Sequence, residues 1–244
     1  MLGLITGSGF YSLPGLANAV DRDVETPYGT VSLVHGSWKG CPVVFLPRHG
    51  ADHSVPPQRI PYRANLWALA EAGARAVFAT AVSGGINPEY RNGELVLIDQ
   101  FINFTHGRED TFFDEEVRHT DMTEPYDRYL RQVLSETATS EAIELVDGGV
   151  YLCANGPRFE TPAEIRMYAG FGCDLVGMTG YPEVVLAREL DLPYAAVGVV
   201  SNPAAGMGSE ELSLDDIMAV LDEAAEPLLR LLGGAAELLA RRWA

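Results

Sequence analysis

The sequence is poor in positive charge, and above all in lysine. It has 17 Lys and Arg residues against 34 Asp and Glu, which gives a net charge of −17 at pH 7, and Lys39 is its only lysine. Duplex nucleic acids bind to basic faces, so this balance argues against a nucleic-acid partner. It also means that an anionic ligand must be held by a few local groups and not by the overall field of the protein.

Cysteine and histidine are too few and too scattered to predict a metal site. His49 and His53 have helical spacing, but Pro56-Pro57 disfavours a helix there, and no carboxylate or thiol joins the histidines at a zinc spacing. The cysteines stand singly and are interpreted as buried thiols in a reducing compartment. They are Cys41, Cys153 and Cys173. We expect neither a metal nor another cofactor.

Long apolar runs are absent too. No segment approaches the length of a membrane span, and the first residues show no basic stretch followed by an apolar core and a cleavage site. These features predict a cytoplasmic protein without membrane contact. At 244 residues, 47% of them hydrophobic, the chain suits one large α/β domain over residues 1–244.

Short apolar runs alternate with amphipathic segments along the chain. This alternation predicts a central mixed sheet that is flanked by helices on both faces. We expect strands at Leu2–Thr6, Val31–Val34, Pro42–Leu46, Ala76–Val82, Leu95–Ile98, Gly149–Cys153, Asp174–Gly177 and Tyr194–Val200. We expect helices at Tyr62–Ala72, Tyr126–Thr137, after a Thr161 cap, at Pro182–Leu190 and after Ser213, the last with breaks at Pro227 and Gly233-Gly234. Residues 99–114 are expected to form a long loop, compatible with a lid or an interface.

The segment Gly156–Thr161 combines groups that suit a purine. Phe159 offers a stacking face and Glu160 a carboxylate, while Asn202 supplies an amide after a later strand. A 6-oxopurine carries a proton on N1 and an acceptor at O6, so it needs a carboxylate acceptor and an amide donor. The competing interpretation gives Glu160 and Asn202 only local capping roles.

Other strand ends carry groups that suit an anion. Ser8 lies in a Gly-rich turn after the first strand, and Arg48 and His49 follow the strand that ends at Leu46. Ligands of open α/β sheets collect at such ends, and an Arg fork beside an imidazole suits a doubly charged oxyanion. Each of these features alone is also compatible with a tight corner or a surface ion pair.

The order of these segments resembles the trimeric purine nucleoside phosphorylase and methylthioadenosine phosphorylase family, from Leu4 to about the start of the last helix. The landmarks are Thr6-Gly7-Ser8-Gly9, Glu25–Gly29, Arg48-His49-Gly50, Tyr62–Leu69, Val96–Phe101, Gly156–Thr161, Gly177–Thr179 and Pro182-Glu183. The resemblance implies the nucleoside phosphorylase fold, a pentosyltransferase that uses phosphate as co-substrate, and a homotrimer or a hexamer that is a dimer of trimers.

The resemblance also implies roles for single residues. Phosphate is expected at Ser8, Arg48, His49, the backbone of Ala81 and Val82, and Thr179. The nucleoside is expected at Phe159, Met178, Asn202, Pro203 and Ala204, and at His119 of a neighbouring subunit. The residues expected to act in catalysis are His49, Glu160 and Asn202.

Two positions predict the substrate. Family members that take 6-aminopurines place aspartates where this chain has Asn202–Ala205, and an amide, unlike a carboxylate, donates to O6 while accepting from N7–H. Members that bind a free 5′-hydroxyl tend to have a histidine where Leu214 falls. The apolar stripe there favours a methylthio group, although such a stripe also fits a helix face that packs on a core. The stripe consists of Leu212, Leu214, Ile217 and Met218.

The prediction is phosphorolysis of S-methyl-5′-thioinosine to hypoxanthine and 5-methylthioribose 1-phosphate. Inosine or guanosine is the second choice of substrate and methylthioadenosine the third. A non-catalytic nucleoside sensor is the alternative from another class, although it would not need a phosphate site. A dinucleotide-dependent oxidoreductase is disfavoured, because Ser12 stands where its fingerprint requires a third glycine.

Overall fold

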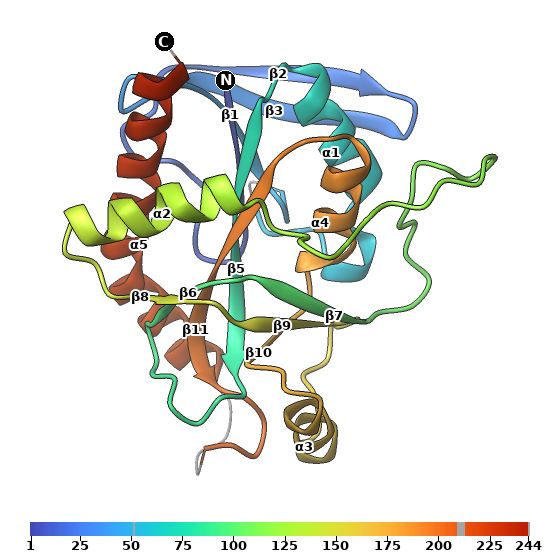
Figure 1. Cartoon of the computed structure of the whole chain (residues 1–244), viewed down its shortest axis with the longest axis vertical. Helices are drawn as coiled ribbons and strands as arrows, with labels where there is room; N and C mark the ends of the chain where they lie inside the picture. The colour runs from blue at the N-terminus through green and yellow to red at the C-terminus, as the bar shows by residue number, and fades with distance from the viewer. Residues whose placement is uncertain (51, 209–212, 244) are drawn as a thin grey trace.

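The computed structural model has one long strand, β5 (Ala76–Gly85), at its centre (Figure 1). The structure describes residues 1–50, 52–208 and 213–243. Along one edge β5 pairs in parallel with β1 (Leu2–Thr6), and along the other it pairs in parallel with β11 (Tyr194–Pro203). Its last two residues also pair with β10 (Leu175–Gly177), in antiparallel fashion.

Further strands extend the sheet from this centre to eleven within the described residues. Beyond β1 lie β4 (Cys41–Pro47), β3 (Gly29–Trp38) and β2 (Ala17–Thr26). Beyond β10 lie β9 (Val150–Ala154) and β7 (Gln100–Phe104), and beyond β11 lie β6 (Leu95–Leu97) and β8 (Leu145–Asp147). Parallel and antiparallel pairs occur together, so the predicted mixed sheet is confirmed.

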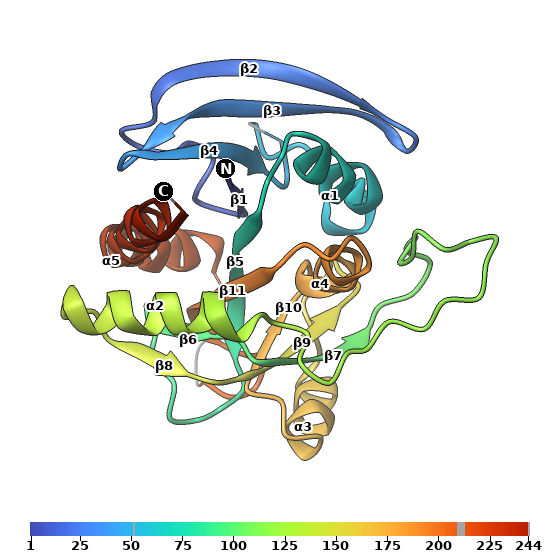
Figure 2. The same cartoon turned by 45° about the horizontal axis from the view of Figure 1, so that its top comes forward.

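Helices cover both faces of the sheet, as Figure 2 shows. On one face α1 (Tyr62–Glu71) packs beside α4 (Gly180–Glu189), and on the other α2 (Arg128–Ser140) packs beside α5 (Leu214–Trp243). The short α3 (Pro162–Gly170) lies near the ends of β9 and β10, and a 3₁₀ turn, η1 (Pro57–Arg59), precedes α1. Among the described helices, none combines the length and the apolar composition that crossing a membrane requires.

Three strands are missing from the sequence prediction. The side chains of β2 are almost all exposed in its edge hairpin with β3, so the strand lacks an apolar alternation. The prediction of a loop over residues 99–114 is wrong for its first part, because β7 pairs in parallel with β9 there. β8 pairs with β6 at the other margin of the sheet, and its three residues are too few to give a periodic signal.

The last helix is continuous, and the predicted breaks at Pro227 and Gly233-Gly234 are wrong. A long apolar face of α5 is buried against the sheet and α2, and this burial outweighs the roughly 3 kcal/mol that a proline inside a helix costs. Gly234 serves helix packing, because a Cβ there would lie 2.7 Å from Thr137 Cγ2 of α2. The missing side chain lets the two helices approach.

Residues 105–125, between β7 and α2, form an arm that projects from the body of the protein (Figures 1 and 2). The root of the arm is fixed, since Thr111 Oγ1 and Phe112 N donate to the Glu189 carboxylate over 2.8 and 2.7 Å. Val117 and His119 are exposed further out. The predicted role of this region as a lid or an interface stays a prediction.

Candidate active site

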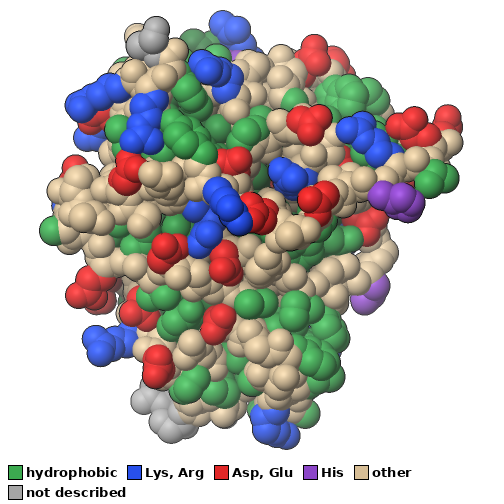
Figure 3. Space-filling view, in the orientation of Figure 1, with side chains coloured by type: hydrophobic (Ala, Val, Ile, Leu, Met, Phe, Trp, Pro, Cys, Tyr) green, Lys and Arg blue, Asp and Glu red, His purple; other side chains and the backbone are tan. Residues whose placement is uncertain are grey.

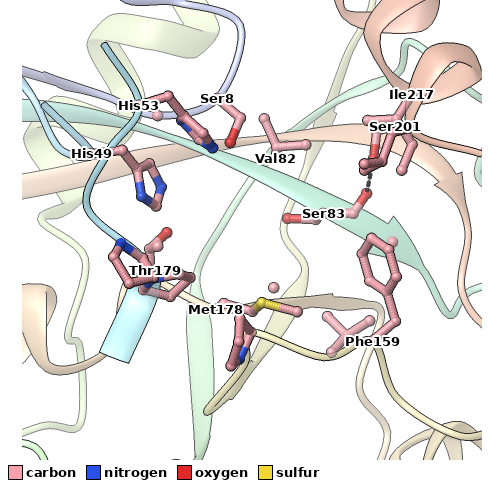
Figure 4. Close-up of a pocket in the computed structure, with 18 of the residues that line it drawn as sticks. Ser8, His49, His53, Val82, Ser83, Phe159, Met178, Thr179, Ser201 and Ile217 are labelled. Carbon is pink, nitrogen blue, oxygen red and sulfur yellow. Dashed lines mark hydrogen bonds between the residues drawn. The ribbon is translucent and has the colours of Figure 1, made fainter. Parts of the chain in front are cut away.

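A cavity of about 670 Å³ opens where several strands end. It collects residues that follow β1, β4 and β10 and residues at the ends of β5 and β11, which is where open α/β sheets hold their ligands. Its volume is that of a small-molecule site. Figure 4 shows Ser8, His49 and Thr179 at one end and Phe159 at the other. We call the first the anion end (Ser8, Arg48, His49, Thr179) and the second the base end (Phe159, Glu160, Asn202).

Ser8 is held at the cavity by a tight turn after β1. Phe10 N donates to Gly7 O over 3.1 Å and closes the turn. Gly9 adopts a positive φ of 81°, which favours glycine. Gly7 leaves room for Arg48, because a Cβ there would lie 3.0 Å from Arg48 Nη1, and the same Cβ would be in ordinary contact with His49 Nε2 at 3.9 Å. Both groups therefore converge beside Ser8.

Arg48 is the buried cation of the anion end. Its Nε and Nη2 donate to the two carboxylate oxygens of Glu183, each over 2.7 Å, and its Nη1 donates to Thr80 O over 3.0 Å. Burial alone would lower the pKa of Arg48, but the charge and hydrogen bonds of Glu183 raise it above its ordinary value. Of the five guanidinium N–H donors, two then remain without a partner among the described residues, and these can reach a ligand.

His49 is neutral and presents an acceptor. Its Nδ1 lies 2.8 Å from Val55 O, and because a carbonyl oxygen only accepts, Nδ1 carries the proton. Burial lowers the pKa of His49 to about 4, and the charge of Arg48 adds to the effect. Near neutral pH, Nε2 therefore has a lone pair that can accept the O–H of a hydrogen phosphate ion.

Met178 and Thr179 follow β10 on the floor of the cavity. Thr179 is the N-cap of α4, but its side chain makes no capping bond with the described residues, so its hydroxyl remains for a ligand. The backbone is held by Tyr151 OH, which accepts from Thr179 N over 3.2 Å, and by Arg108 Nη2, which donates to Met178 O over 2.8 Å. A Cβ on Gly156 would lie 2.6 Å from Met178 Sδ, so a side chain here would displace Met178, and the φ of 65° at this position also favours glycine.

The base end is built on the turn before α3. Thr161, the predicted N-cap, forms a capping box with Glu164, in which Thr161 Oγ1 accepts from Glu164 N over 3.2 Å. Glu160 is thus not part of the capping box and lies in the cavity wall, where burial raises its pKa. Phe159 beside it is partly exposed and also lines the cavity (Figure 4).

Asn202 lies near the end of β11. Ser201 Oγ donates to Asn202 Oδ1 over 2.7 Å, and Asn202 Nδ2 donates to Pro203 O over 2.8 Å. These bonds hold the carboxamide in one orientation and leave one N–H and one acceptor lone pair for a ligand. Asn202 therefore makes a local bond, as the competing interpretation expects, and lines the cavity as well.

The entrance of the cavity is apolar on the side of α5. We call Leu214, Ile217 and Met218 the apolar mouth; Leu214 is 70% exposed and Met218 is partly exposed. Leu212, the fourth member of the predicted stripe, lies outside the described residues.

The cavity brings most of the predicted site residues together. They are Ser8, Arg48, His49, Val82, Phe159, Glu160, Met178, Thr179, Asn202, Ala204 and Leu214. Ala81 and Pro203 are not among the described lining residues, and the roles expected of the Ala81 backbone and of Pro203 stay predictions. Ala81 is packed in the core below the end of β5. Pro203 is exposed at the end of β11, between two residues that line the cavity. His119 lies on the arm, and its contact with a neighbouring subunit stays a prediction.

Several residues of the site are missing from the sequence prediction. Ser83 and Ser201 lie on strands whose apolar runs mask them, and Tyr11 lines the cavity beyond the Gly-rich turn. For Glu183, the only indication of a role in the sequence is that Pro182-Glu183 is a landmark of the family resemblance. Its partner Arg48 lies 135 residues away in the sequence, so their pairing has no local signature.

Comparisons with known proteins agree with this geometry over nearly the whole chain. The family model described as "Phosphorylase superfamily" matches residues 1–237. A probable 6-oxopurine nucleoside phosphorylase of Moorella thermoacetica is 48% identical over 225 residues, which cover 91% of this chain and 86% of that protein. A probable S-methyl-5′-thioinosine phosphorylase of Methanothermobacter thermautotrophicus is 43% identical over 237 residues, which cover 96% of this chain and 83% of that protein.

A solved structure is similar as well. The methylthioadenosine phosphorylase from Schistosoma mansoni in complex with adenine matches with a TM-score of 0.92 and 33% identity, covering 98% of this chain and 91% of that chain.

Proposed function

The chain belongs to the phosphorylase superfamily and is a pentosyltransferase, and from this premise we propose that it cleaves S-methyl-5′-thioinosine with phosphate. The products are hypoxanthine and 5-methylthioribose 1-phosphate. The observation that carries the proposal is that one cavity joins an anion end to a base end whose two polar groups are Glu160 and Asn202. The relative of that name in Methanothermobacter thermautotrophicus supports it.

The base end suits a 6-oxopurine. The Glu160 carboxylate accepts from N1–H, the remaining Asn202 N–H donates to O6, and Asn202 Oδ1 accepts from N7–H as the base departs. Adenine reverses this pattern, since its N1 is an acceptor and its 6-amino group a donor. Unpaired buried groups of this kind cost about 1–3 kcal/mol each, enough to select the oxopurine.

In the proposed reaction the C1′–N9 bond breaks and a C1′–O bond to phosphate forms. The electron pair of the broken bond goes to the purine, which gains one proton, while hydrogen phosphate loses one, so atoms and charge balance. Arg48, Ser8 and Thr179 orient the phosphate, and His49 Nε2 accepts its O–H. Orientation and hydrogen bonds to the developing charges supply the rate, and no metal or other cofactor takes part.

Inosine or guanosine is the second candidate substrate. Two observations favour it: Leu214 is exposed to water, which can solvate a 5′-hydroxyl, and the Moorella thermoacetica relative is named for 6-oxopurine nucleosides. Methylthioadenosine ranks third because of Glu160 and Asn202. A nucleoside sensor ranks last, since it has no use for the buried donors of the anion end.

We also propose that the protein is a cytoplasmic homotrimer, or a hexamer made of two trimers. The projecting arm with exposed Val117 and His119 supports this. So does an apolar patch around α3, where Phe104, Met167 and Phe171 are each more than a third exposed (Figure 3). Light scattering coupled to size-exclusion chromatography tests the assembly, and a monomer would contradict it. Three free cysteines in the interior fit a reducing compartment.

The function is tested by release of free base from methylthioinosine, inosine, guanosine and methylthioadenosine, with and without phosphate. We expect phosphate-dependent release with the highest kcat/KM on methylthioinosine. A preference for methylthioadenosine would contradict the roles of Glu160 and Asn202, and equal values for inosine and methylthioinosine would contradict that of Leu214. Tight nucleoside binding without release in the presence of phosphate would indicate a sensor.

A further inference from the structure

Glu183 lies behind the anion end and is not part of the cavity lining. We infer that Glu183, held by Tyr194, is a positioning residue for phosphate: it fixes the Arg48 guanidinium so that two of its N–H donors face the anion end. The inference rests on the proposed phosphorolysis, because it concerns the co-substrate of that reaction.

The three side chains come from separate elements and meet in the core. Glu183 lies on α4, Tyr194 begins β11 and Arg48 follows β4. The side chains of Arg48 and Glu183 are 1% and 0% exposed and are joined by two bonds of 2.7 Å. Tyr194 OH donates over 2.6 Å to Glu183 Oε1, the oxygen that also accepts from Arg48 Nη2, so the carboxylate itself is held by a second element.

This arrangement fixes the direction of the remaining donors. A guanidinium is planar, and two parallel bonds from its Nε and Nη2 edge define both its plane and its rotation. The bond from Nη1 to Thr80 O adds a third constraint. The two N–H groups that are left, one on each Nη, therefore point in set directions, and Nη1 is near the backbone of Gly7 beside Ser8.

Stability alone does not account for the pair. Removing two charges from water is costly, and a buried ion pair is often no more stabilising than apolar residues of the same size. A buried pair is useful where a cation must be held in a defined orientation toward a ligand. Arg48 meets this condition because it lines the cavity while Glu183 and Tyr194 lie behind it. The carboxylate also cancels the charge of Arg48, so phosphate meets directed donors and not an uncompensated cation.

The test uses the full-length enzyme with E183Q and Y194F, and measures steady-state rates while phosphate or nucleoside is varied. We expect the KM for phosphate to rise by about tenfold to 10²-fold in E183Q, because misplaced donors lose orientation, and by a smaller factor in Y194F. The KM for the nucleoside should stay within about twofold of wild type, since the base end is untouched. Phosphate should also raise the Tm of both variants by less than it raises that of wild type.

Glu189 provides a matched control on the same helix. It is buried and accepts two hydrogen bonds, but its partners are Thr111 and Phe112 of the arm. E189Q should lower thermal stability and leave the KM for phosphate unchanged. E183D keeps the charge but is one methylene shorter. Compared with E183Q, it should therefore restore thermal stability more fully than it restores the KM for phosphate.

The outcomes separate the inference from the proposed function. If the wild-type enzyme releases no base on addition of phosphate, the proposed function fails. If it is active and the KM for phosphate is unchanged in E183Q and Y194F, or rises in parallel with the KM for the nucleoside, Glu183 is a structural ion-pair partner only. If E183Q does not fold, Y194F decides, and an unchanged KM for phosphate in that variant overturns the inference.

Discussion

The two ends of the cavity are built in different ways. At the anion end Arg48, His49 and Thr179 are buried, and their partners come from distant parts of the chain, such as Glu183 of α4. At the base end Glu160 and Asn202 are only partly buried, and the bonds that fix Asn202 come from its own neighbours. One end is part of the core, and the other is a pair of surface segments placed beside it.

Under the proposed function, this difference separates reactivity from specificity. A change at the anion end disturbs the buried network and so affects folding together with phosphate binding. A change at the base end alters hydrogen bonds to the purine and leaves the core intact. If these roles hold, the same scaffold can keep its phosphate chemistry while its base preference changes, and the two ends should respond differently to substitution.

Replacing Arg48 should have the largest effect. R48M keeps much of the volume but removes the donors, and we expect kcat/KM for phosphate to fall by about 10²–10³-fold. It also leaves Glu183 buried without its cation, so the free energy of unfolding should drop by about 3–5 kcal/mol. Steady-state kinetics and chemical denaturation measure the two effects.

A double variant separates these effects. R48M/E183Q removes both charges and should regain much of the lost stability without regaining activity. Recovery of activity along with stability would mean that Arg48 serves only the fold, and the contrast between the two ends would then fail.

Asn202→Asp should have the next largest effect, and on specificity instead of folding. A carboxylate cannot donate to O6 but accepts from a 6-amino group, so the ratio of kcat/KM for methylthioadenosine to that for methylthioinosine should rise by about 10²-fold or more. The midpoint of thermal unfolding should change little. S201A is the control: it loosens the amide without changing its chemistry, and should shift the ratio less. An unchanged ratio in N202D would remove Asn202 from base recognition.

The same contrast explains what could be predicted from the sequence. Next to the base end, two side-chain bonds connect residues one to three positions apart, Thr161 with Glu164 and Ser201 with Asn202, and local patterns can indicate bonds of this kind. At the anion end the supporting bond from Arg48 to Glu183 spans 135 residues, and the bond that holds Met178, next to Thr179, spans 70 residues from Arg108. A single sequence carries no signal for such pairs.

The errors in the fold have a related cause. The sequence predicts buried strands such as β1 and β5 because apolar runs mark them. It misses β2 and β7 because these lie at the margins of the sheet, where side chains are exposed and only backbone bonds define the strand. In α5 the packing of a long apolar face overrides local breakers such as Pro227, which no local rule anticipates.

Leu214→His should have a smaller effect, at the apolar mouth. An imidazole donates to or accepts from a 5′-hydroxyl and fits a methylthio group poorly, so the ratio of kcat/KM for inosine to that for methylthioinosine should rise by about tenfold. Stability should be unaffected because Leu214 is mostly exposed. L214V keeps the surface apolar and should leave the ratio near that of wild type. A tenfold rise in L214V as well would point to a change of shape and not of polarity.

The smallest effect should be a change of base preference with pH. A change of pH compares the two ends of the cavity without any substitution. Burial raises the pKa of Glu160, so as pH falls this carboxyl takes up a proton earlier than an exposed glutamate would. The protonated group no longer accepts from N1–H of a 6-oxopurine but can donate to N1 of adenine. The KM for methylthioinosine should therefore rise on acidification, and methylthioadenosine should gain in relative kcat/KM.

The anion end should contribute little to this pH dependence. His49, with a pKa of about 4, stays neutral through the range in which Glu160 begins to protonate. In E160Q the ratio between the two substrates should therefore become independent of pH, whereas both rates should still follow the ionisation of phosphate. The raised pKa of Glu160 also links stability to pH. Because the carboxyl ionises less readily in the folded state than in the unfolded state, its ionisation opposes folding as pH rises. E160Q should therefore be more stable than wild type at neutral pH. A ratio that still varies with pH in E160Q would place the titrating group elsewhere in the cavity.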